Sequence, residues 1–149
     1  MGCTLRYTAS PAEALAGARI VCTATTSSHP VFADADLAPG AHVNAIGSFR
    51  PDMREVPLET VARARIVVDS RTAAALEAGE LVHAVGAGMT LAEAWAELGE
   101  LVAGAAALSL PGSGVTLFKS VGLAVQDLAA AGAVLETARR EGLGRTVEV

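Results

Sequence analysis

Polar residues directly follow three short apolar runs of this chain. The runs and the polar segments after them are 19–23 with 24–30, 42–46 with 47–52, and 65–69 with 70–71. The hydroxyl groups in these segments can donate or accept hydrogen bonds, and glycine lets a ligand approach the backbone closely. We therefore expect these segments to bind a polar ligand. The alternative is that the hydroxyls only cap helices and satisfy the amides of turns.

Lys119 is the only lysine in the chain, and Ser120 follows it at the predicted start of the last helix. Because the N-terminus of a helix favours anions, a cation at this place opposes the helix macrodipole. Lys119 could therefore help to bind an anionic ligand together with free helix amides. The alternative is a lysine whose stem packs on the protein while its ammonium group stays in water.

No metal site is predicted from the sequence. Glu80 lies three residues before His83, but no third ligand is nearby. One loop has mixed charge, and we expect solvated ion pairs there, among Arg50, Asp52, Arg54 and Glu55. The two cysteines are far from any Cys-x-x-Cys spacing, which excludes a disulfide scaffold, and we expect both to be buried and inert.

The elements that position these residues are strands alternating with helices. The three apolar runs are short, contain β-branched residues and are bounded by turn residues, as is typical of strands buried on both faces. Residues 4–7 are expected to form a fourth strand near an edge. Helices are expected over 11–18, 58–63, 72–78, 91–98 and 120–141. This alternation predicts an α/β fold with a parallel sheet, in which ligands bind beyond the carboxyl ends of the strands.

Composition excludes several classes of protein. The chain has 149 residues, of which 52% are hydrophobic and 18% charged, so it has enough apolar surface to fold as one domain. Its net charge of −5 argues against nucleic acid as a partner. The uncharged run 101–118 is interrupted by a predicted turn at 111–114, so no membrane span is expected. The N-terminal residues do not form a signal peptide, and we expect a cytoplasmic protein.

Four segments resemble the ornithine cyclodeaminase/μ-crystallin family: residues 23–25, 39–55, 67–78 and 116–127. The resemblance implies a Rossmann-type domain that binds NAD or NADP, without deciding between them. It also implies a small amino or imino acid as substrate and a homodimer in a full-length parent. The residues that match the family's cofactor-binding positions are Thr23, Ala24, Thr25, Ile46, Gly47, Ser48, Lys119 and Ser120, the last two on the nicotinamide side.

The chain differs from the family in length. Family proteins are about twice as long, and no G-x-G-x-x-G fingerprint precedes Thr4. We therefore expect an N-terminally truncated member, inactive as an isolated chain. Residues 1–112 would form the C-terminal half of the Rossmann-type domain. Residues 113–149 would form a strand and helix tail that returns to a missing dimerisation domain.

A second difference concerns the reaction. Ornithine cyclodeaminases have a catalytic aspartate two residues after the glycine that matches Gly47, and this chain has Phe49 there. A phenyl ring cannot accept a proton, so the resemblance favours the NAD(P)-dependent reductases and alanine dehydrogenases of the family. Ornithine cyclodeaminase, an ammonia lyase, is the alternative enzyme. A non-catalytic binding or dimerisation module is a third possibility, and no catalytic residue is assigned.

Overall fold

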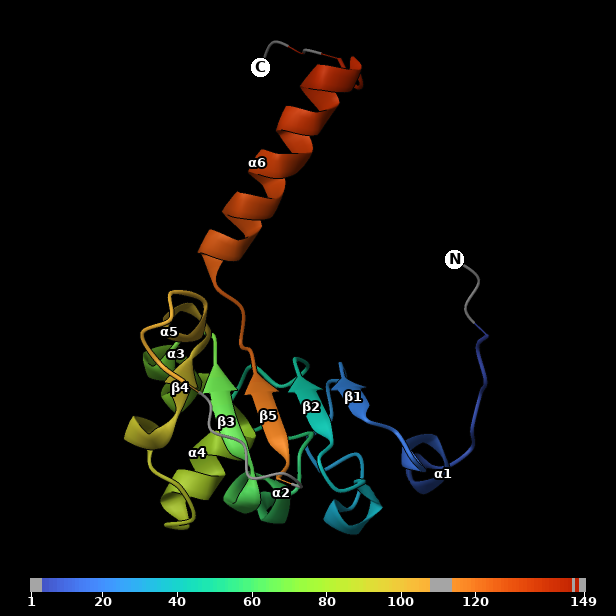
Figure 1. Cartoon of the computed structure of the whole chain (residues 1–149), viewed down its shortest axis with the longest axis vertical. Coiled ribbons are helices and arrows are strands. Elements are labelled where there is room, and N and C mark those ends of the chain that lie inside the picture. Colours follow the sequence, from blue (N-terminus) through green and yellow to red (C-terminus); the bar gives the residue numbers. More distant parts are fainter. Residues whose placement is uncertain (1–3, 108–113, 146, 148–149) are drawn as a thin grey trace.

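Five parallel strands form one sheet in the computed structural model, which describes residues 4–107, 114–145 and 147. The strands are β1 (Ile20–Thr23), β2 (His42–Ala45), β3 (Arg65–Val68), β4 (Ala96–Glu97) and β5 (Thr116–Lys119). Their order across the sheet is β1-β2-β5-β3-β4 (Figure 1). The three strands expected from the sequence are confirmed, each within one residue of the predicted ends.

Helices connect these strands and extend the chain after β5. The α-helices are α1 (Pro11–Leu15), α2 (Leu58–Arg63), α3 (Arg71–Glu77), α4 (Gly79–Gly86), α5 (Leu98–Val102) and α6 (Ala124–Glu141). Two 3₁₀ turns are η1 (Asp34–Asp36) and η2 (Ala92–Ala94). None of the helices in the described part of the chain combines the length and apolar character needed to cross a membrane.

Two expected elements are wrong. Residues 4–7 pair with no strand of the described chain, and Leu5 and Tyr7 are 94% and 93% exposed. Residues 91–98, expected as one helix, divide into η2, β4 and the first residue of α5. Within this segment Trp95 is buried and β4 pairs with β3, so aromatic burial and strand pairing override the helix propensity of an alanine-rich segment.

Several ends of helices and strands also differ from those expected. Gly79, expected to close a helix, begins α4, where a Cβ atom would overlap the Met53 carbonyl oxygen. Ser120 does not cap the last helix, because α6 begins only at Ala124. The strand assigned to the tail from residue 113 is β5, which lies in the middle of the sheet (Figure 1). The predicted turn at 111–114 falls mainly on residues outside the described ranges.

One face of the sheet carries the hydrophobic core. The residues buried on the core face alternate along the strands, as a pleated sheet requires. They are Val21, Thr23, Val43, Ala45, Ile66, Val68, Leu117 and Lys119. Val61 of α2 and Leu81 of α4 belong to the same buried cluster, and these two helices contact each other beside the sheet. Val67 of β3 is also buried but lies on the opposite face.

The other face of the sheet is partly uncovered. Ile20 is 67% exposed, and His42 and Asn44 are half-buried beside a pocket of about 300 Å³ that Phe118 also lines. Cys22 is exposed on this face, so the expectation that it is buried is wrong; Cys3 lies outside the described residues. The His42 ring contacts the Thr116 hydroxyl at 2.7 Å, which ties β2 to β5.

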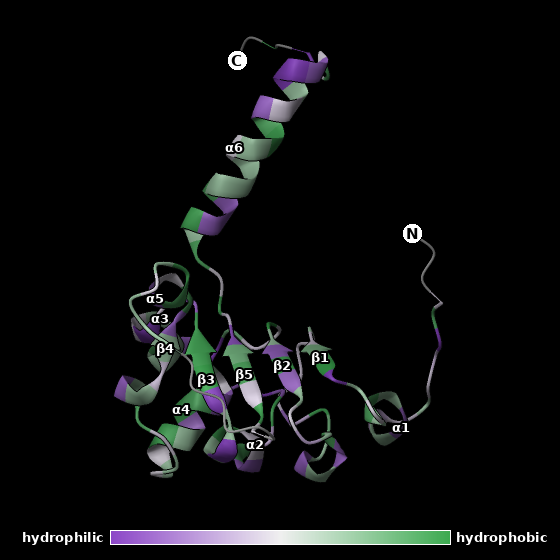
Figure 2. Ribbon diagram, viewed as in Figure 1, coloured by the Kyte–Doolittle hydropathy of each residue, from purple (hydrophilic) through white to green (hydrophobic). Residues whose placement is uncertain are grey.

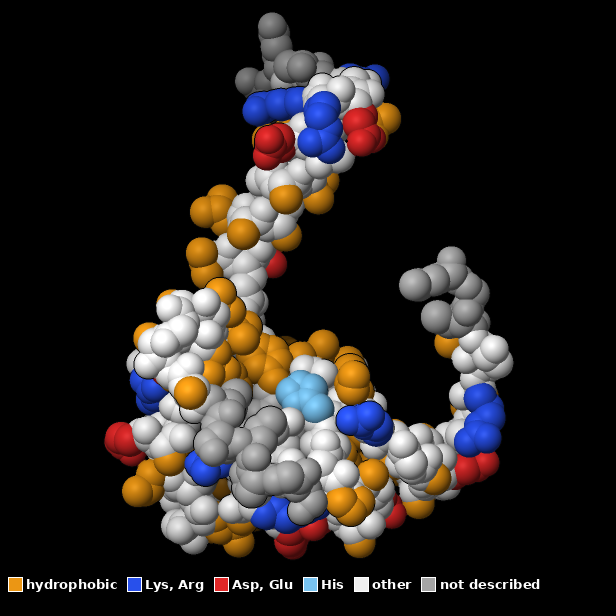
Figure 3. All heavy atoms as spheres, in the orientation of Figure 1, with side chains coloured by type: hydrophobic (Ala, Val, Ile, Leu, Met, Phe, Trp, Pro, Cys, Tyr) orange, Lys and Arg blue, Asp and Glu red, His pale blue; other side chains and the backbone are white. Residues whose placement is uncertain are grey.

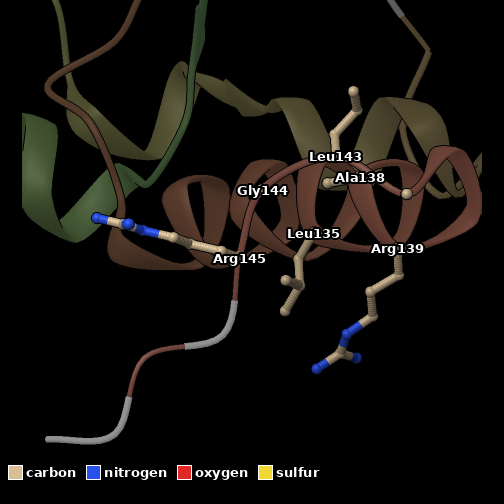
Figure 4. Close-up of a pocket in the computed structure, with 7 residues that line it drawn as sticks. Leu135, Ala138, Arg139, Leu143, Gly144 and Arg145 are labelled. Carbon is tan, nitrogen blue, oxygen red and sulfur yellow. The ribbon is translucent and has the colours of Figure 1, made fainter.

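Helix α6 extends away from the sheet, and none of its residues is buried (Figures 1 and 2). Val125, Leu128 and Leu135 are 64%, 73% and 50% exposed, and hydrophobic side chains are visible along the helix in Figure 3. At its end Gly142 adopts a left-handed conformation and Leu143 turns back over Ala138 (Figure 4). This surface of a single helix end is too open to form a site.

Asp34 joins η1 to α2 and makes stability depend on pH. Partial burial raises the pKa of Asp34. Hydrogen bonds from Thr60 and the Arg63 guanidinium outweigh this effect and bring the pKa below its usual value of 3.8. Because the folded carboxyl binds a proton less readily than the unfolded one, its stabilising effect is present above that value and is lost as the pH falls through the lowered pKa. We expect Asp34→Asn to cost up to about 1 kcal/mol near neutral pH.

Urea unfolding of both proteins at about pH 6 and about pH 2.5 checks this expectation. The difference between wild type and Asp34→Asn should shrink at the lower pH. An equal difference at both values contradicts it. Glu59→Gln, at an exposed position of α2, is the matched control.

Candidate functional site

The strands end side by side at one edge of the sheet. Thr23 is in register with Ala45, and Ala45 and Val68 are both in register with Lys119. The polar segments that follow β1, β2, β3 and β5 therefore leave the sheet at the same carboxyl edge. The sequence-based expectation that these segments meet is confirmed by the parallel registers.

The predicted site residues differ in how much they face solvent. Ala24, Thr25 and Ile46 are exposed, and Gly47 and Ser120 are half-buried. Thr23, Ser48 and Lys119 are buried. The exposed part of this edge therefore combines the small Ala24 and Thr25 with the larger Ile46, and the buried residues lie beneath it.

Glu55 is a buried carboxylate that joins the loops after β1 and β2. Its Oε1 accepts a hydrogen bond from the Thr25 backbone N–H at 2.5 Å. Its Oε2 accepts from the Gly47 N–H at 2.8 Å and from the Thr23 hydroxyl at 3.0 Å. The side chain is 0% exposed, so three donors satisfy a carboxylate that has no access to water. Glu55 lies later in the connection between β2 and α2, so a single residue ties the start of that connection to the loop after β1.

Sequence reasoning missed Glu55. It was expected to form solvated ion pairs with its loop, and this is correct only for Arg50 and Asp52, whose side chains are 61% and 66% exposed. The hydrogen-bond donors that make the burial of Glu55 favourable lie 8 to 32 positions away in the sequence. No local sequence pattern therefore indicates them. The one available signal is that Glu55 directly precedes Val56-Pro57, which are also buried.

Gly47 packs tightly against the loop after β1. A Cβ atom at this position would overlap the backbone nitrogen and oxygen of Thr25 and crowd the Glu55 carboxylate. The requirement for glycine is therefore steric. It does not come from a left-handed backbone, since Gly47 does not have a positive φ. The loops after β1 and β2 are therefore in direct backbone contact at Thr25 and Gly47.

Lys119 lies in the protein interior with Glu80 and Ser48. Its ammonium donates to the Ser48 carbonyl at 2.5 Å and to the Ser48 hydroxyl at 2.7 Å, and it lies 3.2 Å from Glu80 Oε1. All three side chains are 0% exposed. The alternative of a solvated lysine is therefore wrong, because the ammonium group does not reach water. Sequence reasoning also missed Glu80, which it weighed only as a metal ligand.

Asp69 holds the segment that follows β5. Its Oδ2 accepts from the Ser120 hydroxyl at 2.8 Å and from the N–H groups of Val121 and Gly122 at 3.0 and 2.9 Å. Asp69 thus uses the hydroxyl that was expected to cap the last helix. Among the residues that the structure describes, no cluster of three or more His, Cys, Asp or Glu side chains could hold a metal ion.

A family model described as the ornithine cyclodeaminase/mu-crystallin family matches residues 1–142. The chain belongs to this family. It is 42% identical over 140 residues to a Delta(1)-pyrroline-2-carboxylate reductase of Bacillus cereus, covering 93% of this chain and 43% of that protein. It is 38% identical over 133 residues to the ketimine reductase mu-crystallin of Mus musculus, covering 89% of this chain and 40% of that protein.

Solved structures of the ornithine cyclodeaminase/mu-crystallin family have the same fold. The structure of Thermococcus litoralis Delta(1)-pyrroline-2-carboxylate reductase in complex with NADH and L-proline superposes with a TM-score of 0.85 at 35% identity. It matches 93% of this chain and 43% of that chain. The expected α/β fold with a Rossmann-type sheet is thus confirmed, and this family member spans less than half the length of the relatives it matches.

Proposed function

We propose that this chain is part of a nicotinamide-dependent imino-acid reductase and holds the nicotinamide half of NAD(H) or NADP(H) at the carboxyl edge of its sheet. The observation that carries the proposal is the close packing of the Thr25 and Gly47 backbones where β1 and β2 end, which the buried Glu55 carboxylate holds in place. The likeness to a reductase structure with NADH and L-proline supports the same reading.

The residues at this edge fit one end of a dinucleotide. Ala24 is small and exposed, so a flat ring can approach the backbone there, and the exposed Thr25 hydroxyl can bond to a polar group. The sequence contains no G-x-G-x-x-G turn that would hold the pyrophosphate. We therefore assign the nicotinamide side to this chain, without assigning the pyrophosphate site to it.

When bound, reduced nicotinamide supplies a hydride to the carbon of the substrate's C=N bond, and the nitrogen gains a proton. The role of this chain's residues is orientation, which in enzymes supplies a large share of the rate. Gly47 and Thr25 would set the depth at which the ring lies. Phe49, 49% exposed after Ser48, offers no carboxylate for chemistry on a free amino group, which favours reduction over ornithine cyclisation.

Two surfaces fit contacts with further parts of a longer protein. Helix α6 has an exposed apolar stripe, and the uncovered sheet face carries Ile20 beside the open edge of β1. Apolar surface of this kind is typical of interfaces. We propose that α6 packs on a separate dimerisation domain in a homodimer, and that residues 4–119 belong to the dinucleotide domain. This moves the proposed domain boundary from residue 112 to the end of β5.

A chimera tests the proposed function. The 43% of the Bacillus cereus reductase that this chain matches is replaced by residues 1–149, with the parent reductase as control. We expect the chimera to oxidise NADH or NADPH only when Δ1-pyrroline-2-carboxylate is present, because the nicotinamide edge is retained. We expect the isolated chain to bind either cofactor weakly and to show no turnover. Nicotinamide fluorescence and absorbance measure binding and turnover.

Two results contradict the proposal. One is a chimera that is folded by circular dichroism but binds neither NADH nor NADPH. The other is ammonia release from ornithine without net change in NADH, which assigns the ornithine cyclodeaminase reaction instead.

A further inference from the structure

Ser48 is held by a buried ion pair. β2 ends at Ala45, so the Ser48 carbonyl lies beyond the last residue of the strand ladder. Its described hydrogen-bond donor is the ammonium of Lys119, at 2.5 Å. The Ser48 hydroxyl accepts from the same ammonium and donates to Glu80 Oε2 at 2.5 Å. Lys119 and Glu80 together thus hold the carbonyl and the hydroxyl of Ser48.

Burying this ion pair carries a large desolvation penalty. Removing an ammonium and a carboxylate from water costs free energy that their attraction does not always repay, and well-packed apolar residues are often as stabilising. Glu80 Oε1 lies 3.2 Å from the ammonium and accepts no hydrogen bond among the described residues, so the carboxylate is only partly satisfied. Stability alone is therefore a poor explanation for a lysine and a glutamate at these positions. Directional donors, however, can fix a backbone carbonyl in a way that apolar side chains cannot.

Gly47, the residue before Ser48, is held by a different buried charged group. The Gly47 N–H donates to Glu55, while the Ser48 carbonyl accepts from Lys119. Two buried charged groups from different segments thus determine the path of the Gly47-Ser48 dipeptide. One of them, Lys119, reaches it from the middle strand of the sheet, and Asp69 holds the residues directly after Lys119.

We infer that Lys119 is a positioning residue: paired with Glu80, it sets the course of Gly47-Ser48 and so determines which backbone groups this edge presents to the nicotinamide. It acts through Ser48 and has no exposed surface with which to contact the ligand. The inference rests on the proposed function for its consequence at the cofactor, while the effect on Gly47-Ser48 can be measured without any cofactor.

The test separates position from stability with a double variant. Lys119→Met alone leaves the Glu80 carboxylate buried without a cation, and we expect it to destabilise the chain. Lys119→Met with Glu80→Leu removes both charges, and we expect it to recover most of that stability. In this double variant the amide NMR signals of Gly47 and Ser48 should remain displaced from their wild-type positions. Arg140→Met, which removes an exposed cation 4.0 Å from Glu141, is the control and should leave these signals unchanged.

The same double change in the chimera tests the consequence for the cofactor. We expect the Kd for the reduced cofactor to rise about tenfold, because a small misplacement of binding groups has large effects at such sites. Wild-type Gly47 and Ser48 signals with wild-type cofactor affinity in a folded double variant would overturn the inference. If the double variant does not fold, Glu80→Gln replaces it, and unchanged signals in that variant count equally against positioning. A chimera that never binds cofactor refutes the proposed function instead, and the amide signals of the 149-residue chain still decide the role of Lys119.

Discussion

Replacing Glu55 with alanine should lower the free energy of unfolding by about 3 kcal/mol or more, because buried donors that lose their acceptor cost about 1–3 kcal/mol each. The carboxylate satisfies the N–H groups of Thr25 and Gly47 and the hydroxyl of Thr23. The hydroxyl can turn toward another partner, but the two backbone N–H groups are fixed. A loss of this size is a large fraction of the 5–15 kcal/mol that is typical of a whole domain. Urea unfolding followed by circular dichroism measures it.

Glutamine at the same position should give a smaller loss. Its side chain has one carbonyl oxygen, so whichever way the amide is oriented, either Thr25 or Gly47 faces an NH₂ group instead of an acceptor. The expected order of stability is wild type, then Glu55→Gln, then Glu55→Ala. Glu59→Ala, at an exposed position of α2, should change stability by less than about 0.5 kcal/mol. A stable Glu55→Ala variant with the wild-type midpoint would contradict the role assigned to this carboxylate.

Gly47→Ala should destabilise the chain by about 3 kcal/mol, near the upper end of the cost of overpacking. The added methyl group would overlap backbone atoms of Thr25, which cannot rotate away as a flexible side chain can. The loops after β1 and β2 must then separate, which also breaks the surface proposed to hold the nicotinamide. We therefore expect the chimera with Gly47→Ala to lose measurable cofactor binding.

Gly132 provides the matched control for this substitution. It lies within α6, and a Cβ atom there would meet nothing within 4 Å. Gly132→Ala should therefore stabilise the helix by up to about 1 kcal/mol, through helix propensity alone. Equal effects at the two positions would show that glycine replacement as such, rather than the contact with Thr25, decides the outcome.

The sequence predicted the elements whose signals are local. The three apolar runs became β1, β2 and β3, and the expected helix over 58–63 has the bounds of α2. The meeting of the polar segments at one edge also followed, because parallel strands with right-handed crossovers end on the same side. Thr25 and Gly47 were placed correctly at that edge by this argument.

The parts that could not be predicted depend on contacts between distant residues. Glu55 was expected to form solvated ion pairs and Glu80 was weighed only as a metal ligand, since only the groups that fold around these carboxylates make their burial favourable. The middle position of β5 was missed for a related reason: its composition indicates a strand but says nothing about which neighbours it pairs with. Ser120 was expected to cap a helix, but its hydroxyl donates to the carboxylate of Asp69, which directly follows β3.

The late position of β5 in the sequence also determines the order in which the sheet can form during synthesis. Before residue 116 has been made, β1 can pair only with β2, and β3 only with β4, so the nascent chain holds two separate strand pairs with open inner edges. Glu80 meanwhile has no cation to pair with, because Lys119 arrives on the same strand that closes the gap. The sheet and its buried ion pair can therefore become complete only after β5, the last of its strands in the sequence, has been made.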